Sequence, residues 1–385
     1  MVNTSTKQLI KQLEDSRSFL KKKKLSSDYK LALANYIGNI YRALLCLGKI
    51  DVVFDKKRVF GSEKKYNEFV KKMDFYSDLM INNYIQNKNF HREFFSEILP
   101  DVEDSISNFK NIDDIDDIIL SRNDFFDIFY QFMRSINQED LFDELYNNGH
   151  IYSILVGQDE GNVGFTLYGP VNRNLDVFIK DLKYSLFDMN TLAHEMGHCF
   201  DLKNFKNGIS DYNKFFYLSF FGEVCSRLFE RLLLDFLRNN NIYADKADVK
   251  QIEFELLNYD FILQSYIFSL FSNKFILEDK YIECDSKEIM KMIKDHFVDP
   301  DFIESYIDSI ISFDLAEVYN YCYGDIVSMF LHSDIKKYGF SLEIFDSFFN
   351  ERCKLFDEDY FMKNGYTPEK YLKLYKKSIK NISSS

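Results

Sequence analysis

Residues 194–198 read His194-Glu195-Met196-Gly197-His198, and this pentapeptide is the most informative stretch of the chain. On an α-helix, residues four apart lie on one face, so both imidazoles can bind one zinc ion. The carboxylate of Glu195 then lies beside the metal, where it can take a proton from a zinc-bound water. We therefore expect a helix here, with His194 and His198 as zinc ligands and Glu195 as general base. The simpler alternative is a solvated helix face that carries these residue types by chance.

Glu223 is the predicted third ligand. A catalytic zinc site has three protein ligands and one open position for water. Between residues 217 and 229 the chain is mostly apolar, and Glu223 is its single acid. Because an unpaired carboxylate is costly to bury, a metal ion is a fitting partner for it. The alternative is a salt bridge to Arg227, four residues later on the same helix.

Four more residues lie near the predicted ligands in sequence. Ser226 and Glu230 fall three and seven residues after Glu223, and we expect them to orient the ligands. For Glu230, a surface ion pair with a neighbouring arginine is the alternative. Cys199 and Cys225 are expected to be small core residues, since the ligand set is complete without them.

Composition favours long helices and a cytoplasmic protein. The 385 residues include only 4 Pro and 14 Gly, too few for a fold rich in turns. The formal net charge of −13 argues against nucleic acid as a partner. No apolar stretch is long enough for a membrane span, and no signal peptide is recognisable. The six cysteines are scattered, as in proteins of a reducing compartment, and nothing in the sequence indicates an oligomeric state.

Helical and strand-like patterns divide the chain into two predicted regions, 1–147 and 148–385. The first has apolar residues at helical spacing and is expected to be an N-terminal helical subdomain. The second opens on a glycine-rich stretch with three runs typical of strands, and then becomes helical again. The predicted strands are Ile151–Val156, Val163–Tyr168 and Leu175–Asp181.

Local signals also predict where several helices of the second region begin. We expect Asp188 to be the N-cap of the helix that carries the pentapeptide. A long helix is predicted over residues 211–237. Asp299-Pro300 and Thr367-Pro368 each offer an N-cap followed by proline at the first helical position.

The two motifs together resemble a known family. His194-Glu195-x-Gly197-His198 followed by Glu223-x-x-Ser226-x-x-x-Glu230 is similar to the thimet oligopeptidase and oligoendopeptidase F family of zinc peptidases. The separation of the motifs matches as well. Further similar segments, within a resemblance that covers residues 150–330, are Gly164-Phe165, Asp176-Val177-Phe178-Ile179, Thr191-Leu192-Ala193 and Tyr319-Asn320-Tyr321-Cys322-Tyr323.

This resemblance implies a large, mainly α, gluzincin-type zincin fold, with a small sheet of about three strands beside the active-site helix. It implies a zinc endopeptidase that hydrolyses short peptides, with one zinc ion per chain and a peptide as its partner. The hydroxyl of Tyr321 would stabilise the developing oxyanion, although a core or surface tyrosine is the alternative. The strand Leu175–Asp181 is expected to lie at a sheet edge and pair with the substrate main chain.

Two positions depart from the family pattern. Asp201 stands where the family usually has a further histidine, and the substrate-contacting histidine upstream of the tyrosine segment has no counterpart. His296 or His332 is a candidate second oxyanion donor, with a structural or exposed role as the simpler alternative. Substrate preference therefore does not transfer from the family to this chain.

Three other functions compete with a general oligopeptidase. Glu195-x-x-His198 is half of a di-iron signature, but the second Glu-x-x-His that such a site needs is missing from the sequence. A dedicated protease for one protein or precursor peptide is compatible with the short chain. A non-catalytic peptide-binding protein would have no need of Glu195, which is present.

Overall fold

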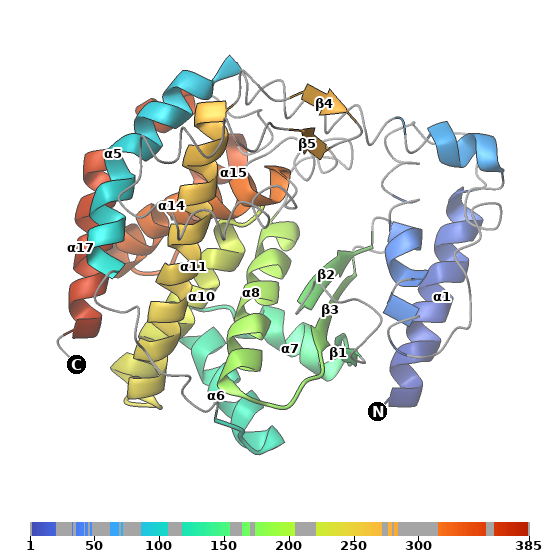
Figure 1. The fold of residues 1–385 in the computed structure, drawn as a ribbon. Helices are drawn as coiled ribbons and strands as arrows, with labels where there is room; N and C mark the ends of the chain where they lie inside the picture. The colour runs from blue at the N-terminus through green and yellow to red at the C-terminus, as the bar shows by residue number, and fades with distance from the viewer. Residues whose placement is uncertain are drawn as a thin grey trace.

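The computed structural model confirms a mainly α-helical fold with a small three-stranded sheet beside the helix that carries residues 194–198 (Figure 1). It describes residues 2–20, 33, 36–41, 43–44, 47, 62–68, 71, 86–106, 118–154, 164–169, 174–204, 221–271, 276–278, 281–283, 315–351 and 358–383. The helices are α1 (Val2–Leu20), α5 (Lys88–Ile106), α6 (Arg122–Ser135), α7 (Glu139–Asn147), α8 (Leu186–Lys203), α10 (Val224–Asn239), α11 (Ala244–Phe271), α14 (Leu315–Tyr338), the 3-10 helix η2 (Leu342–Phe345), α15 (Asp346–Glu351), α16 (Glu358–Lys363) and α17 (Pro368–Ser383). The strands are β1 (Ile151–Ile154), β2 (Gly164–Tyr168), β3 (Leu175–Lys180), β4 (Ile276–Glu278) and β5 (Tyr281–Glu283).

All three predicted strands form, but their order differs from the expectation. The sheet runs β1-β3-β2, with β3 parallel to β1 and antiparallel to β2. The prediction that the strand Leu175–Asp181 lies at an edge is therefore wrong, because β3 is paired on both sides. The first five residues of β3 are all buried, as expected for a central strand covered on both faces.

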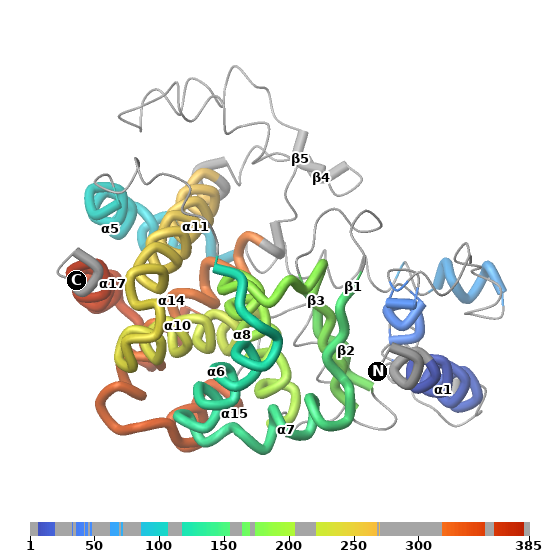
Figure 2. Tube along the Cα trace, turned by 90° about the horizontal axis from the view of Figure 1, so that it is seen from below, coloured from blue at the N-terminus to red at the C-terminus, as the bar shows by residue number. Residues whose placement is uncertain are grey.

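The sheet separates two apolar cores. Successive side chains of a strand point to opposite faces, so Val177 and Ile179 join the main core while Phe178 joins a second one. The second core is made with residues such as Leu9 of α1 and Ile37. Figure 2 shows α8 on one side of the sheet and α1 on the other.

A capping box starts helix α8. The N-cap is Ser185, whose hydroxyl accepts from the backbone N–H of Asp188, and the Asp188 carboxylate accepts from the N–H of Ser185. The prediction that Asp188 is the N-cap is therefore wrong by three residues. Serine and aspartate are both favoured at helix starts, and here the acid takes the third helical position of the box.

Helix α10 begins later than the sequence predicts. Of the predicted helix 211–237, residues 211–220 lie outside the described part of the chain, and residues 221–223 form a turn. Glu223 is the N-cap, and the helix runs from Val224 to Asn239. The turn is held from outside, because the N–H of Gly222 donates to the side-chain oxygen of Asn320 on α14 at 3.4 Å.

The start of α17 agrees with its prediction. The helix begins at Pro368, and the hydroxyl of Thr367 accepts from the N–H of Lys370 at 3.4 Å. The similar signal at Asp299-Pro300 lies outside the described residues.

None of the helices in the described ranges has the length and apolar character needed to cross a bilayer. The cytoplasmic location and the division into regions 1–147 and 148–385 stay predictions.

His91 links the stability of the fold to pH. It lies on α5 with 0% of its surface exposed, and its Nδ1 contacts the hydroxyl of Tyr323 on α14. Burial lowers the pKa of His91 to about 3, so the folded protein keeps this imidazole neutral. In the unfolded chain the same group takes up a proton below its ordinary pKa of about 6.5. Stability from the neutral imidazole is thus complete above pH 6.5 and is lost as the pH falls toward 3.

Substitution of His91 by Gln should flatten this dependence. Between pH 7 and 5 the native protein should lose about 2 kcal/mol more unfolding free energy than His91→Gln, from a slope of about 1.4 kcal/mol per pH unit below 6.5. Urea unfolding at the two pH values measures this difference. Equal losses in both proteins would show that His91 takes up its proton in the folded state.

Candidate metal centre

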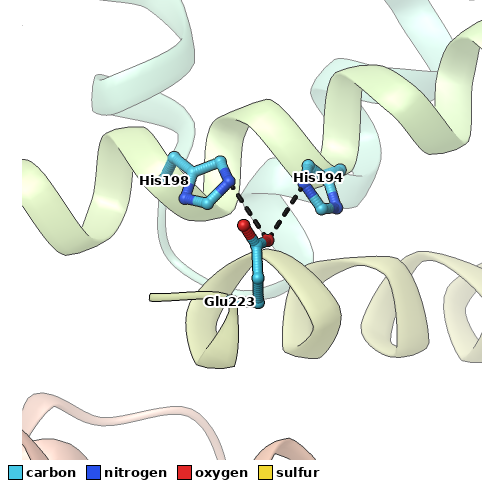
Figure 3. Close-up of side chains that lie close together, drawn as sticks. All are labelled: His194, His198 and Glu223. Atoms are coloured by element: carbon cyan, nitrogen blue, oxygen red, sulfur yellow. Dashed lines mark ion pairs between the residues drawn. The ribbon is translucent and has the colours of Figure 1, made fainter. Parts of the chain in front are cut away.

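Three predicted ligands from two helices converge on one point. His194 and His198 lie one turn apart on α8, and Glu223 caps α10. Nε2 of His194 lies 3.2 Å from Oε2 of Glu223, and Nε2 of His198 lies 3.3 Å from the same oxygen (Figure 3). One ligand atom from each of the three residues can be chosen so that all lie within 4.8 Å of one another.

The chemistry of these donors fits zinc. Two imidazole nitrogens and one carboxylate oxygen are a ligand set of catalytic zinc sites, which leave a further position open. The three side chains are 14%, 17% and 17% exposed, so each keeps a small accessible surface. The alternative of a Glu223–Arg227 salt bridge is not what forms, because the Arg227 guanidinium binds Glu230 and Asn258.

The charges around this cluster favour a positive charge among the three donors. Burial by itself raises the pKa of Glu223, but the imidazoles of His198 and His194 hold it well below its usual range. Burial likewise lowers the pKa of His194, but the carboxylates of Glu223 and Glu230 raise it well above 6.5. Two ionised carboxylates therefore face His194, and they stabilise either a proton or a metal ion at this place.

Ser226 and Glu230 hold the ligands as the sequence predicts. The Ser226 hydroxyl donates to Oε2 of Glu223 at 2.6 Å. Oε1 of Glu230 lies 2.5 Å from Nδ1 of His194, which turns the Nε2 atom toward Glu223. Glu230 also pairs with Arg227, as its alternative predicted, but at 4% exposure this ion pair lies in the interior and not at the surface. Such outer partners fix the ring orientation of a metal-bound histidine.

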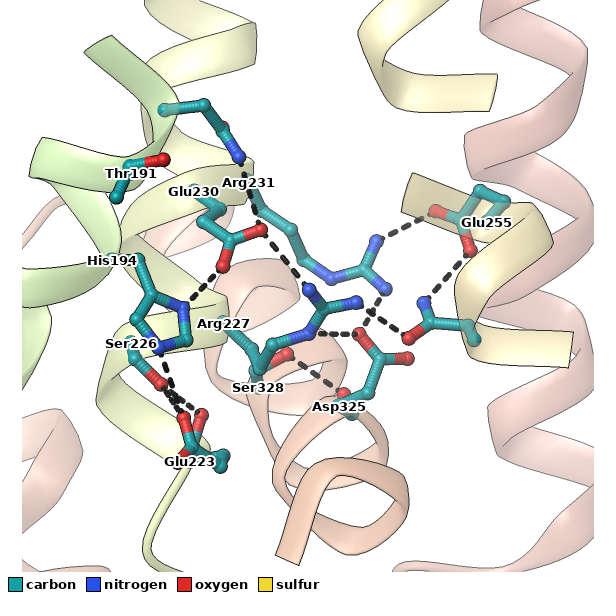
Figure 4. Close-up of polar contacts among 12 residues, drawn as sticks. Thr191, His194, Glu223, Ser226, Arg227, Glu230, Arg231, Glu255, Asp325 and Ser328 are labelled. Carbon is teal, nitrogen blue, oxygen red and sulfur yellow. Dashed lines mark hydrogen bonds and ion pairs between the residues drawn. The ribbon is translucent and has the colours of Figure 1, made fainter. Parts of the chain in front are cut away.

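A buried ion-pair network extends behind Glu230 (Figure 4). Its members are Arg227, Glu230, Arg231, Glu255, Asn258 and Asp325. Arg227 donates to Glu230 at 3.0 Å, which keeps the pKa of that carboxyl low although burial raises it. Arg231 donates to Glu255 at 2.9 Å and to Asp325 at 2.6 Å.

Most of this network is not predicted from the sequence. A usable signal exists at Asp325, which is the single acid in the apolar stretch 322–331 of α14. The reasoning that selects Glu223 as a buried acid in need of a partner selects Asp325 equally well. Its partner is an arginine 94 residues earlier in the chain, and no sequence pattern connects the two.

Two glycines allow the helices around the site to touch. A Cβ atom on Gly197 would lie 2.3 Å from the backbone oxygen of Cys225 on α10. On α14, a Cβ on Gly324 would lie 2.7 Å from Cβ of Glu223. Only glycine permits these approaches, which hold Glu223 between the two other helices.

The predicted base, Glu195, lies next to this cluster. It is 3% exposed, and the hydroxyl of Thr166 on β2 donates to its Oε2 atom at 2.6 Å. Burial raises the pKa of Glu195, while the two histidines and Thr166 oppose that rise without cancelling it. A carboxylate with a raised pKa is a better proton acceptor, as general bases require. Thr166 escaped the sequence analysis.

Tyr321 lies beside the predicted ligands. Its ring centroid is 6.2 Å from that of His194 with an angle of 20° between the planes, and it stacks on Phe261 at 4.8 Å. Tyr321 is partly exposed, whereas Tyr319 and Tyr323 on the same helix are fully buried. The structure thus places Tyr321 at the site, and its catalytic role stays a prediction.

The other residues considered from sequence lie away from the donors or outside the described chain. His332 binds Asp235 at 2.7 Å. Asp235 follows Glu223 by twelve residues on α10, about 18 Å along a helix, which places His332 away from the site. Asp201 is buried, and His296 is not among the described residues. Cys199 and Cys225 are buried, and neither belongs to the donor cluster.

Comparison with known proteins shows a shared fold. No protein-family model and no curated protein matches the chain. The solved structure of PZ peptidase A with an inhibitor superposes with a TM-score of 0.52 at 10% identity, over 97% of this chain and 80% of that chain. A structure described as oligoendopeptidase F superposes with a TM-score of 0.55 at 10% identity, over 100% of this chain and 81% of that one. At such low identity the likeness establishes the fold.

From the three donors and the contact of Glu230 with His194, we predict how two substitutions change zinc binding. Glu223→Ala removes a ligand oxygen and should lower zinc content to well below one ion per chain. Glu230→Gln keeps all three donors but weakens the acceptor for His194 Nδ1, so zinc affinity should fall by about 10- to 100-fold. Elemental analysis and competition with a chelating dye measure the two effects.

Glu144→Gln is the matched control for Glu230→Gln. It removes a carboxylate that pairs with Lys203 of α8 at 3.0 Å, but at the surface, where it is 55% exposed. Zinc affinity should be unchanged in this variant. Unchanged zinc content in Glu223→Ala would mean that another residue is the third ligand.

Proposed function

We propose that this chain is a zinc-dependent peptidase. The observation that carries the proposal is the convergence of two imidazole nitrogens and one carboxylate oxygen within 4.8 Å, with Glu195 close enough to interact electrostatically with all three donors. The fold that holds these residues is shared with PZ peptidase A, a protein named as a peptidase. His194, His198 and Glu223 would hold one zinc ion per chain.

A zinc ion in this place supplies Lewis acidity, which lowers the pKa of water to about 7 and polarises a carbonyl. Side chains of the protein carry out the proton transfers. Glu195 takes the proton from the attacking water and then carries it to the nitrogen of the leaving amine. Thr166 supports this step because its hydroxyl binds one carboxylate oxygen and so orients the other.

Tyr321 is the proposed donor to the developing oxyanion. Its ring is inclined by 20° to that of His194 and stacks on Phe261, and these two contacts restrict the side chain. A hydroxyl that is already positioned costs no rearrangement when charge develops on the carbonyl oxygen.

The substrate we propose is an extended peptide that lies along β2. This strand is at an edge of the sheet within the described residues, and its Thr166 contacts the predicted base directly. Pairing through main-chain hydrogen bonds is largely independent of side chains, so it suits many sequences. The sequence led us to expect that β3 pairs with the substrate main chain, and we now propose β2 for this role.

Replacing the base tests the mechanism. Glu195→Gln should retain zinc at one ion per chain and lose peptide hydrolysis by at least about 10²-fold, the low end for a general base. Thr166→Val should cause a smaller loss, and Thr166→Ser should restore most of it, because serine keeps the hydroxyl. Zinc content and the rate of cleavage of a quenched fluorescent peptide are the two measurements. Undiminished turnover in Glu195→Gln would disprove the assigned base.

The breadth of the substrate range separates two versions of this function. A general oligopeptidase that binds main chain should cleave many members of a mixed peptide library, with products identified by mass spectrometry. A protease dedicated to one protein or precursor would cleave at a single sequence. With Glu195→Gln as the blank, the absence of any cleavage by the zinc-loaded native protein would favour a peptide-binding role.

A further inference from the structure

A second, basic pocket lies where α10, α14 and α17 meet. Its volume is about 300 Å³, and none of its lining residues is a predicted metal ligand or the predicted base. Four of its nine lining residues carry a positive charge and none carries a negative one. In a chain with a formal net charge of −13, such a concentration of cations is unexpected. The four are Arg231, Lys336, Lys337 and Lys377.

Acidic neighbours balance only part of this charge. Lys336 pairs with Asp235 at 2.7 Å, and the same carboxylate binds His332, which also lines the pocket. Within the described part of the chain, neither Lys337 nor Lys377 forms a salt bridge. Glu255 and Asp325 both pair with Arg231. Lys337 and Lys377 are therefore the two lining cations without a salt bridge among the described residues, and Asp334 offsets part of the charge of Lys337.

Arg231 gives the second, independent indication. This side chain is 2% exposed and lines the pocket, and its two terminal nitrogens are hydrogen-bonded. Its Nε atom is buried and has no hydrogen-bond acceptor among the described residues. A buried N–H without an acceptor costs about 1–3 kcal/mol, so an acceptor from outside the chain would be stabilising.

The preference for basic residues at helix ends explains only some of the four cations that line the pocket. Basic residues are favoured in the last turns of helices, which accounts for Lys336 and Lys337 near the end of α14. Arg231 lies in the middle of α10, where the helix dipole gives no such preference. Its two ion pairs account for its terminal nitrogens and leave the Nε atom without an acceptor among the described residues.

We infer that this pocket binds a small phosphate-class anion, such as a diphosphate or the phosphate chain of a nucleotide. The lysine ammonium groups supply charge, and the hydroxyls of Ser333 and Ser378 supply further donors. The volume is at the lower end for small-ligand pockets, which suits a compact anion. The ligand would also touch the buried ion-pair network through Arg231, a shared member.

Isothermal titration of the full-length protein with pyrophosphate, and separately with ATP, tests this inference. We expect saturable binding at low salt that weakens as salt is added. Lys337→Gln/Lys377→Gln should bind pyrophosphate at least about tenfold more weakly, because both lining cations without a salt bridge are removed. The matched control is Lys7→Gln/Lys11→Gln, which makes the same change of net charge at exposed positions on α1, a helix that contributes no residue to the pocket lining.

Each outcome of these titrations either supports the inferred anion site or overturns it. Similar affinities for both probes would assign the site to the phosphate chain alone, and tighter ATP binding would assign it to a nucleotide. Absence of saturable binding for both probes overturns the inference. An equal loss in the pocket and control variants overturns it as well, since it would reflect general charge. Peptide hydrolysis without ligand should be the same in all three proteins.

Discussion

Helices α8 and α10 touch backbone to backbone at Gly197, where a single added carbon atom would lie 2.3 Å from a carbonyl oxygen. The geometry of the candidate site follows from this contact. It brings the first turn of α10 beside the histidines of α8, so that Glu223 reaches both rings from the helix cap. A larger residue would push the helices apart and separate the donors, whatever the side chains at 194, 198 and 223.

The second organising feature is the buried charge behind the site. Two arginines and three carboxylates lie together at 5% exposure or less, an arrangement that costs a great deal of solvation. Such groups add little net stability compared with apolar residues. They tolerate almost no displacement, however, because each buried charge that lost its partner would raise the free energy of the folded protein. They join α10 to α11 and α14 and extend to His194 through Glu230. The network therefore fixes the orientation of one imidazole across three helices.

The sequence predicted the parts of this molecule that depend on local spacing. Residues four apart on one helix must share a face, so the pairing of His194 with His198 was foreseeable, as were the three strands and the start of α17. The predictions were wrong where a contact between distant residues determines the local structure. Helix α10 starts only after Glu223 because α14 holds the preceding turn, and β3 is a central strand because β2 pairs with it. Thr166, Arg231 and Asp325 act through partners far away in sequence; an apolar surrounding marks Asp325 as a buried acid, but no local pattern identifies the partner of any of the three.

The partial exposure of the three donors has a consequence for exchange kinetics. Backbone contacts at Gly197 and Gly324 close the side of the cluster that faces α10 and α14. The accessible surface of the donors is small, at 14–17% for each side chain. An ion held there and a second molecule beside it would then share the same small accessible surface. A small molecule bound beside the ion would retard its departure and so would protect the centre against chelators.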